Sequence, residues 1–383
     1  MTDLLNALRR LARTLALCGA FATAANAAEV VEENVQSEEH DFRIVKLAGG
    51  FKHPWGVAQL PDGRFLVTER GGRLALVDGD EVSYIDGVPE VSAMGQGGLL
   101  DVVLHPGYGD GEHDWVYMTF SKPGDDGTAT ALARARLGDG ALVDVKELFV
   151  QDRFSSPGRH YGSRLAWRKD GTLLMTIGDR GVDRSRAQDI NDHAGSVLRL
   201  TETGGAPADN PFAGKEEGHD EIFSYGNRNI QGLAVGADGR IWASEHAART
   251  GDELNLIEPG VNYGWPEATR SKEYSSKAPI GKASMPGMRE ARHIYSGRFA
   301  PSGLAAVDSD RFPRWRGNLL AGGLGSEKLL RVVLQGDDVQ STETLIEGEL
   351  GRIRDVRQGR DGYIYLLNDL PDGGLFRLEP VEN

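Results

Sequence analysis

Four segments of the sequence repeat one pattern, an Asp-Gly pair followed by a short apolar strand. They are residues 61–67, 169–175, 237–243 and 360–366. An Asp-Gly pair is typical of tight β-hairpins, because glycine readily adopts the positive φ that such turns require. Two looser copies, at 111–118 and 315–320, make six units with spacings of 45 to 78 residues. The pattern predicts an all-β fold, a six-bladed β-propeller, in preference to a pair of β-sandwiches.

The first 27 residues differ from the rest. Three arginines precede a short apolar run that ends in an A-x-A pattern at 25–27. This order is typical of a cleaved secretory signal peptide. We therefore expect a signal peptide over 1–27 and a single propeller domain over 28–383. Cleavage would leave no cysteine, which suits a periplasmic location. An amphipathic helix, or a lipoprotein signal at Cys18, is the alternative.

Charge and hydropathy weigh against two classes of function. The chain has 43 basic and 57 acidic side chains and a formal net charge of −14. A protein that neutralises nucleic-acid phosphates needs an excess of lysine and arginine, so we expect no nucleic-acid partner. No apolar run reaches the length of about 18 residues that a membrane-spanning helix requires, so no span is expected.

A histidine and an aspartate flank the third repeat. His160 lies in a glycine- and serine-rich loop just before the repeat, and Asp179 follows its strand. The two ends of one hairpin can meet, so Asp179 could accept a hydrogen bond from one ring nitrogen of His160. That contact would make the other nitrogen a better base. A solvated loop histidine is the simpler interpretation of these residues alone.

Two arginine-containing motifs could bind an anion. Arg228 and Asn229 lie in a polar, glycine-flanked segment before the fourth repeat. Arg352 and Arg354 would project from the same face of a strand, where like charges need an anion or a carboxylate between them. Arginine forms bidentate hydrogen bonds with planar anions, so both motifs favour such a ligand. Pairing with nearby Asp and Glu side chains is the alternative.

A polar loop after the fourth repeat is a weak candidate for a metal site. It contains Glu253 and, a few residues later, Tyr263 among glycines. Carboxylate and backbone carbonyl oxygens suit Ca²⁺. The spacing is not that of an EF-hand, and a solvated acidic turn would give the same composition.

Seven motifs occur together in one order. They are residues 95–101, 160–165, 177–179, 226–233, 251–257, 262–266 and 352–356. This set resembles the soluble, PQQ-dependent glucose/sorbosone dehydrogenase family, and is most similar to its aldose sugar dehydrogenases. The resemblance covers about residues 53–378, nearly the whole expected mature chain, and implies a six-bladed propeller.

The resemblance implies a reaction and its residues. The family oxidises aldoses at C1 to lactones by hydride transfer to the C5 carbonyl of PQQ. His160 matches the general base that takes the C1 hydroxyl proton, and Asp179 matches its acidic partner. Arg228 matches the arginine that faces the quinone oxygen, where positive charge lowers the barrier. The chain lacks a Cys-x-x-Cys-His haem motif, so we expect a separate electron acceptor.

The resemblance also implies contacts with the cofactor. Gln96 and Asn229 match residues that contact PQQ. Arg352 and Arg354 match the pair that holds its carboxylates, of which PQQ has three. Many members place a lysine against PQQ where this chain has Leu324 and Gly325. Lys328 is a nearby candidate to replace that lysine.

Two calcium positions are implied in the same way. Glu253 and Tyr263 match calcium ligands, with Tyr263 expected to use its backbone carbonyl. Ala247 and Ala248 stand where family members often have Gly-Pro, whose carbonyls bind the Ca²⁺ that clamps PQQ. We therefore expect PQQ and Ca²⁺ as cofactors, with the second calcium position less secure.

Two other functions remain open at this point. A propeller lactonase would use Ca²⁺ to polarise a lactone carbonyl, and would need several carboxylate or amide side chains around one channel metal. A non-catalytic propeller would only bind a partner. The lactonase would leave the arginine pair at Arg352 and Arg354 unexplained.

Overall fold

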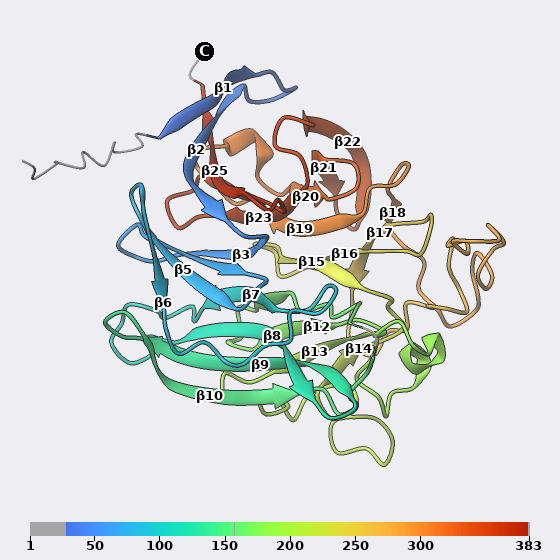
Figure 1. Ribbon diagram of the computed structural model, residues 1–383. Helices are drawn as coiled ribbons and strands as arrows, with labels where there is room; N and C mark the ends of the chain where they lie inside the picture. Colours follow the sequence, from blue (N-terminus) through green and yellow to red (C-terminus); the bar gives the residue numbers. More distant parts are fainter. Residues whose placement is uncertain (1–27, 157, 382–383) are drawn as a thin grey trace, which may run out of the picture.

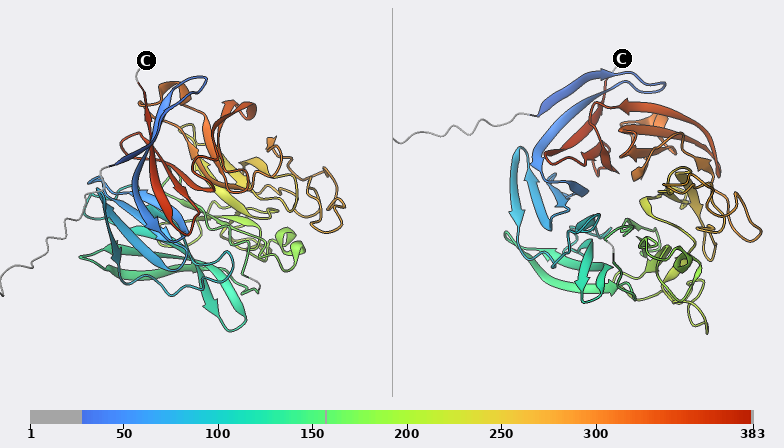
Figure 2. Two further views of the ribbon diagram at one scale, coloured as in Figure 1. Left: turned by 45° about the horizontal axis from the view of Figure 1, so that its top comes forward. Right: turned by 45° about the vertical axis from the view of Figure 1, so that its right-hand side comes forward.

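The computed structural model describes residues 28–156 and 158–381, which form a ring of antiparallel β-sheets (Figure 1). The right-hand view of Figure 2 looks nearly down the axis of the ring and shows the sheets arranged around it, and the region along this axis is called the channel below. The prediction of an all-β, six-bladed propeller is confirmed. The expected signal peptide at 1–27 lies outside the described residues. No helix within the described ranges is long and apolar enough to cross a membrane.

The first five blades each use four consecutive strands. Blade 1 contains β3 (Pro54–Gln59), β4 (Phe65–Glu69), β5 (Arg73–Asp78) and β6 (Glu81–Ile85). Blade 2 contains β7 (Leu99–Leu104), β8 (Val116–Gly124), β9 (Gly127–Leu137) and β10 (Leu142–Val150). Blade 3 contains β11 (Leu165–Trp167), β12 (Leu173–Ile177), β13 (Ser196–Leu200) and β14 (Ile222–Ser224). Blade 4 contains β15 (Ile230–Val235), β16 (Ile241–Glu245), β17 (Glu253–Ile257) and β18 (His293–Ile294). Blade 5 contains β19 (Pro301–Ala306), β20 (Leu319–Gly323), β21 (Lys328–Gln335) and β22 (Asp338–Glu347).

Blade 6 joins the two ends of the described chain. Its inner strands are β23 (Ile353–Gln358), β24 (Ile364–Asn368) and β25 (Gly373–Pro380). The early strand β2 (Phe42–Phe51) pairs with β25, and β1 (Glu29–Val35) pairs with β2 at the outer edge. Two short 3₁₀ helices, η1 (Arg184–Gln188) and η2 (Pro313–Trp315), lie in the connections.

The repeated Asp-Gly pairs form the turn between the first and second strands of their blades. In all four copies the aspartate side chain accepts a hydrogen bond from the N–H two residues later, at 3.0–3.1 Å. Gly63 and Gly239 have φ values of 94° and 86°, and a Cβ atom at either would meet nothing within 4 Å. Backbone conformation, and not lack of space, therefore explains glycine at these turns.

Apolar side chains fill the interfaces between neighbouring blades, and ion pairs fill the channel. Each of the six large apolar clusters joins two adjacent blades. In the channel, Arg164 Nη1 lies 2.8 Å from Asp355 and 3.3 Å from Asp101. Arg357 contacts the same two carboxylates at 2.5 and 3.0 Å. These pairs tie together the inner strands of blades 2, 3 and 6.

Candidate active site

The residues that follow the second strand of each blade lie at one end of the ring. The first and second strands are antiparallel, so the chain enters one and leaves the other at the end opposite the Asp-Gly turns. In four blades the residue after the second strand donates its N–H to the residue before the first strand. These bonds join Arg70 to His53, His246 to Asn229, Leu324 to Ala300 and Asp369 to Arg352, at 2.7–3.1 Å. All of these residues except His53 line one cleft of about 830 Å³.

His160 and Asp179 meet beside this cleft. His160 Nδ1 lies 2.6 Å from Asp179 Oδ1, and both side chains are buried. Asp179 also accepts from the Gly181 N–H and from Trp265 Nε1, both at 2.8 Å. The interpretation of His160 as a solvated loop residue is therefore wrong. Its backbone has a φ of 54°, and Gln96 Oε1 accepts its N–H at 2.8 Å, which supports this less common conformation.

Burial and the nearby Arg228 guanidinium favour the neutral form of the His160 ring. Burial lowers the pKa of His160, and the Arg228 guanidinium lowers it further, against the raising effect of Asp179. Burial alone would raise the pKa of Asp179, but His160, Arg228 and the Gly181 N–H hold it below its usual value. An ionised Asp179 can only accept, so the ring proton belongs on Nδ1. Nε2 is then the basic nitrogen of the ring, and its lone pair accepts a hydrogen bond from Arg228 Nη2 at 3.2 Å.

Arg228 is fixed by its own backbone and by a neighbouring loop. Its N–H donates to the buried carboxylate of Glu245, and its Nη1 donates to the carbonyls of His246 (3.1 Å) and Ala247 (2.6 Å). Asn229 Oδ1 accepts the Gly162 N–H at 3.1 Å, which ties blade 4 to the His160 loop. The guanidinium therefore has a set position beside the histidine.

The cleft carries an excess of positive charge in an acidic protein. It is lined by six arginines and two aspartates, while the whole chain has a net charge of −14. Arg352 and Arg354 both contact Asp369 Oδ2, at 3.2 and 2.7 Å. A carboxylate of the chain thus separates the two like charges, as the pairing alternative predicted. Buried Arg354 Nε has no hydrogen-bond partner among the described residues. The cleft fits a ligand with several negative charges.

Leu324 and Gly325 also line the cleft, but the nearby lysine does not. Lys328 Nζ lies 2.9 Å from Glu347, on the neighbouring strand β22, and is absent from the cleft lining. The suggestion that Lys328 replaces the family's lysine is therefore not supported. Arg298 lines the cleft together with Leu324 and Gly325 and supplies positive charge there.

The implied calcium ligands occupy two different places. Glu253 and Tyr263 line a separate cavity of about 260 Å³, whereas Ala247 and Ala248 line the large cleft. Tyr263 uses its hydroxyl to donate to the Leu256 carbonyl at 2.6 Å, so its own carbonyl is the group left for a metal. At the second place, the Ala247 carbonyl already accepts from Arg228.

Oxygen atoms around Glu253 fit a hard cation. Asn255 Nδ2 lies 3.1 Å from Glu253 Oε1 and 3.2 Å from Glu245 Oε2, and burial raises the pKa of both carboxyls. Asn255 Oδ1 and Asn227 Oδ1 are buried without a hydrogen-bond partner among the described residues. The buried Glu245 carboxyl, the partly buried Glu253 carboxyl and unpaired amide oxygens are the donor set that Ca²⁺ prefers.

Sequence reasoning missed three residues of this site. Trp265 and Glu245 hold Asp179 and Arg228 in place, and Asp369 separates the arginine pair. Trp265 lay within the motif at 262–266 that the resemblance used. Asp369 follows the second strand of its blade, as Asp179 does in blade 3, and that equivalence was the available signal.

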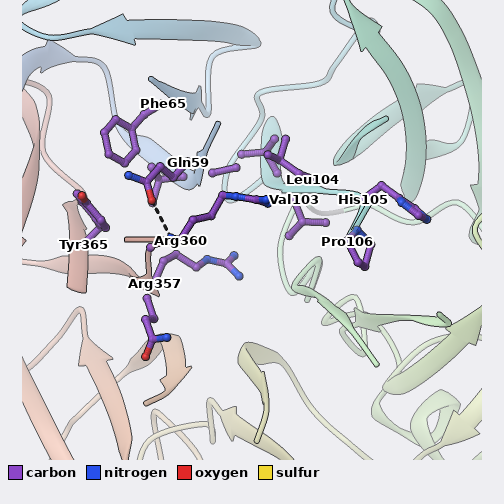
Figure 3. Close-up of a pocket in the computed structure, with 14 residues that line it drawn as sticks. Gln59, Phe65, Val103, Leu104, His105, Pro106, Arg357, Arg360 and Tyr365 are labelled. Atoms are coloured by element: carbon purple, nitrogen blue, oxygen red, sulfur yellow. Dashed lines mark hydrogen bonds between the residues drawn. The ribbon is translucent and has the colours of Figure 1, made fainter. Parts of the chain in front are cut away.

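A further cavity, of about 210 Å³, lies among strands of blades 6, 1 and 2 (Figure 3). Phe65 and Tyr365 form part of its wall, and Gln59 Oε1 accepts the Arg360 N–H at 2.7 Å. None of the predicted site residues lines it.

The channel carboxylates Asp101 and Asp355 are paired with arginines, so they do not form the metal cage that a lactonase would need.

Comparisons with known proteins agree with this geometry. The family described as glucose/sorbosone dehydrogenase matches residues 51–377. Aldose sugar dehydrogenase YliI of Escherichia coli K12 is 39% identical over 337 residues, which is 86% of this chain and 90% of that protein.

Solved structures also resemble this chain. The apo form of the soluble aldose sugar dehydrogenase from Escherichia coli has a TM-score of 0.84 at 36% identity, covering 89% of this chain and all of that one. The PQQ-bound aldose sugar dehydrogenase from Streptomyces coelicolor has a TM-score of 0.73 at 30% identity, covering 88% and 96%. The chain belongs to the glucose/sorbosone dehydrogenase family and is an oxidoreductase of the sugar dehydrogenase type.

Proposed function

We propose that this protein is a PQQ-dependent aldose sugar dehydrogenase that oxidises the C1 hydroxyl of aldoses to a lactone. The observation that carries the proposal is the arginine-rich cleft beside a buried, neutral His160. A relative from Streptomyces coelicolor whose structure is described as PQQ-bound supports the choice of cofactor. When bound, PQQ supplies a quinone that accepts hydride from the sugar.

Three residues of this chain have roles in the proton transfer and in charge stabilisation. His160 Nε2 takes the proton of the C1 hydroxyl as the C1–H bond breaks, so that the carbon becomes the carbonyl of the lactone. Asp179 keeps the ring proton on Nδ1 and stabilises the imidazolium that forms. Arg228 places a fixed positive charge where negative charge grows during the reaction.

Cofactor binding falls to the residues that line the cleft. Arg352 and Arg354 would hold PQQ carboxylates, with Gln96 and Asn229 as polar contacts. Leu324 and Gly325 would form apolar and backbone contacts with the ring system. The cation site at Glu253 would hold Ca²⁺ and stabilise blade 4, next to Arg228.

The proposal also covers the location of the enzyme and the acceptor of its electrons. A cleaved segment at 1–27 and a location in the periplasm follow from the sequence pattern alone. The described residues would then pass electrons to a separate acceptor, which a dye can replace in an assay.

The test is dye reduction by purified apoprotein with a panel of aldoses, with and without PQQ and Ca²⁺. We expect turnover only when PQQ is present, and a lactone as the product. Quinone absorbance retained by the protein after gel filtration would measure binding separately. Aldose-dependent turnover that needs no PQQ, or no retained quinone absorbance, would contradict the proposal.

A further inference from the structure

A group of metal-ligating side chains lies outside the site described above, where blades 2 and 3 meet. Asp152 lies two residues after the end of β10, the outer strand of blade 2. His193 lies between η1 and β13, and His219 lies in the loop before β14 of blade 3. One ligand atom from each lies within 4.8 Å of the others. We propose that these three side chains bind a divalent transition-metal ion of the Zn²⁺ class.

Distances between the ligand atoms suit one ion. His193 Nδ1 lies 2.9 Å from Asp152 Oδ1, and His219 Nε2 lies 3.2 Å from Asp152 Oδ2. Ligands at about 2.0–2.2 Å from a tetrahedral Zn²⁺ stand a little over 3 Å apart. Each histidine nitrogen is therefore already close to the separation from Asp152 that a shared ion requires.

One of the two imidazole rings must turn before both can bind the same ion. The His193 and His219 rings are stacked with centroids 4.0 Å apart and an angle of 10° between planes. Stacked rings cannot both direct a lone pair at one ion, so one must tilt. The His219 side chain is 32% exposed and that of His193 is 5% exposed, so His219 has more room to turn.

The outer nitrogen of His193 supplies an independent observation. His193 Nε2 is buried and has no hydrogen-bond partner among the described residues. The nearest carboxylate oxygen, Glu221 Oε2, lies 3.6 Å away. A metal-bound histidine usually donates its other N–H to a carboxylate, which fixes the tautomer. With the proton on Nε2, facing Glu221, the Nδ1 lone pair faces Asp152, whose N–H lies 3.3 Å away and would give up this contact to the ion.

Charge and ligand type select the class of ion. Two imidazoles and a carboxylate suit Zn²⁺ and related ions, whereas Ca²⁺ prefers oxygen ligands only. A divalent cation would also balance the negative charges of the nearby Asp152 and Glu221 carboxylates. The bound ion would join the end of blade 2 to the connection that precedes β13.

That connection also supports the active site. The Asn227 N–H donates to the Gly195 carbonyl, and the Gly226 N–H donates to the Ala187 carbonyl, both at 2.9 Å. These bonds hold the backbone just before Arg228. A metal at His193 would therefore stabilise the segment on which the Arg228 backbone rests, without touching the cleft.

The experiment is a calorimetric titration of Zn²⁺ into the untagged mature chain at pH 8, in excess Ca²⁺ to fill oxygen-ligand sites. We expect one Zn²⁺ per chain and a rise in melting temperature with Zn²⁺. His219→Ala and Asp152→Asn should each weaken Zn²⁺ binding by at least about tenfold, the usual effect of losing a ligand-shell group.

The control is His113→Ala. His113 stacks on His105 at 4.7 Å, but each ring pairs with its own carboxylate, Asp110 or Glu202. This variant should bind Zn²⁺ like the wild type. Replacing Zn²⁺ by Co²⁺ should give a visible absorption that is lost in His219→Ala. No Zn²⁺ binding by the wild type, or equal affinity in His219→Ala, would overturn the proposal.

Discussion

Replacing Asp179 by asparagine tests how the base is held. The two oxygens of Asp179 accept three hydrogen bonds, from His160 Nδ1 and the Gly181 N–H on Oδ1 and from Trp265 Nε1 on Oδ2. Asparagine keeps one oxygen and replaces the other with an NH₂ group that can only donate. Neither orientation of the amide can satisfy all three donors.

Each orientation of the amide has its own cost. With the oxygen toward His160, the NH₂ group opposes the Trp265 N–H and leaves a buried donor unpaired, at about 1–3 kcal/mol. With the oxygen toward Trp265, the NH₂ group opposes the Gly181 N–H and forces His160 Nδ1 to accept. The ring proton then moves to Nε2, the atom that must receive the proton of the sugar.

The expected loss follows from these contacts. A hydrogen bond to a charged group is worth about 1.5–3 kcal/mol, which corresponds to a fall of about 10- to 150-fold in kcat. The double variant Asp179→Asn/Trp265→Phe removes the opposed donor and lets the amide oxygen stay on His160. The additional loss caused by Asp179→Asn should therefore shrink to a few-fold in the Trp265→Phe background.

The assay is kcat for dye reduction at saturating PQQ, Ca²⁺ and aldose, for the wild type, both single variants and the double variant. Circular dichroism and PQQ titration show that each variant is folded and loaded. Trp265 packs against Ala187 and Ile280, so Trp265→Phe will lower the melting temperature, and kcat must be measured well below it. An equal cost of Asp179→Asn in both backgrounds, or an unchanged kcat, would refute the reasoning.

Four further predictions follow from the sites. His160→Ala should lower kcat by about 10²–10⁴-fold. In the wild type, kcat/KM should rise with pH as His160 loses its proton. The midpoint should lie below 6.5 because burial and Arg228 lower the pKa of His160. Near-full turnover of His160→Ala, with the same rise in kcat/KM, would show that another group is the base. Arg352→Ala and Arg354→Ala should raise the Kd for PQQ more than they lower kcat at saturating PQQ, because contacts with the PQQ carboxylates are the same in the ground and transition states. A large fall in kcat at saturating PQQ with an unchanged Kd would contradict a role of these arginines in cofactor binding. Exhaustive EDTA treatment should lower both the melting temperature and PQQ binding; no change in either would contradict the cation site. Mass spectrometry of the exported protein should give a start near Ala28, and an intact Met1 or a lipid on Cys18 would contradict the signal peptide.

Local patterns made the ring and part of the site predictable. The Asp-Gly turns could be found in the sequence because each depends on only a few neighbouring residues. The contact between His160 and Asp179 could be proposed because both flank one hairpin, and strand pairing brings its ends together. In such cases the separation along the chain is short, and the geometry of a single blade is sufficient.

Contacts between different blades could not be predicted in this way. Trp265 reaches Asp179 from blade 4, and Arg164 reaches Asp355 across the channel. The pairing of β2 with β25 had no signal either, because β2 follows no Asp-Gly turn. Burial also depends on the assembled ring, so the neutral state of His160 and the raised pKa of Glu253 required the structure.

The closure of blade 6 has a consequence for how the chain folds. The ring is complete only when β2 (Phe42–Phe51) meets β25 (Gly373–Pro380), which closes a loop of roughly 330 residues. Chain entropy opposes this step by on the order of 5 kcal/mol for a loop of that length. Blades 1 to 5 use strands that are adjacent in sequence, so they can form as the chain emerges, whereas closure must come last. A circular permutant that opens between blades 1 and 2 would make β25 and β2 neighbours in sequence, and should fold faster than the natural order while keeping the same site.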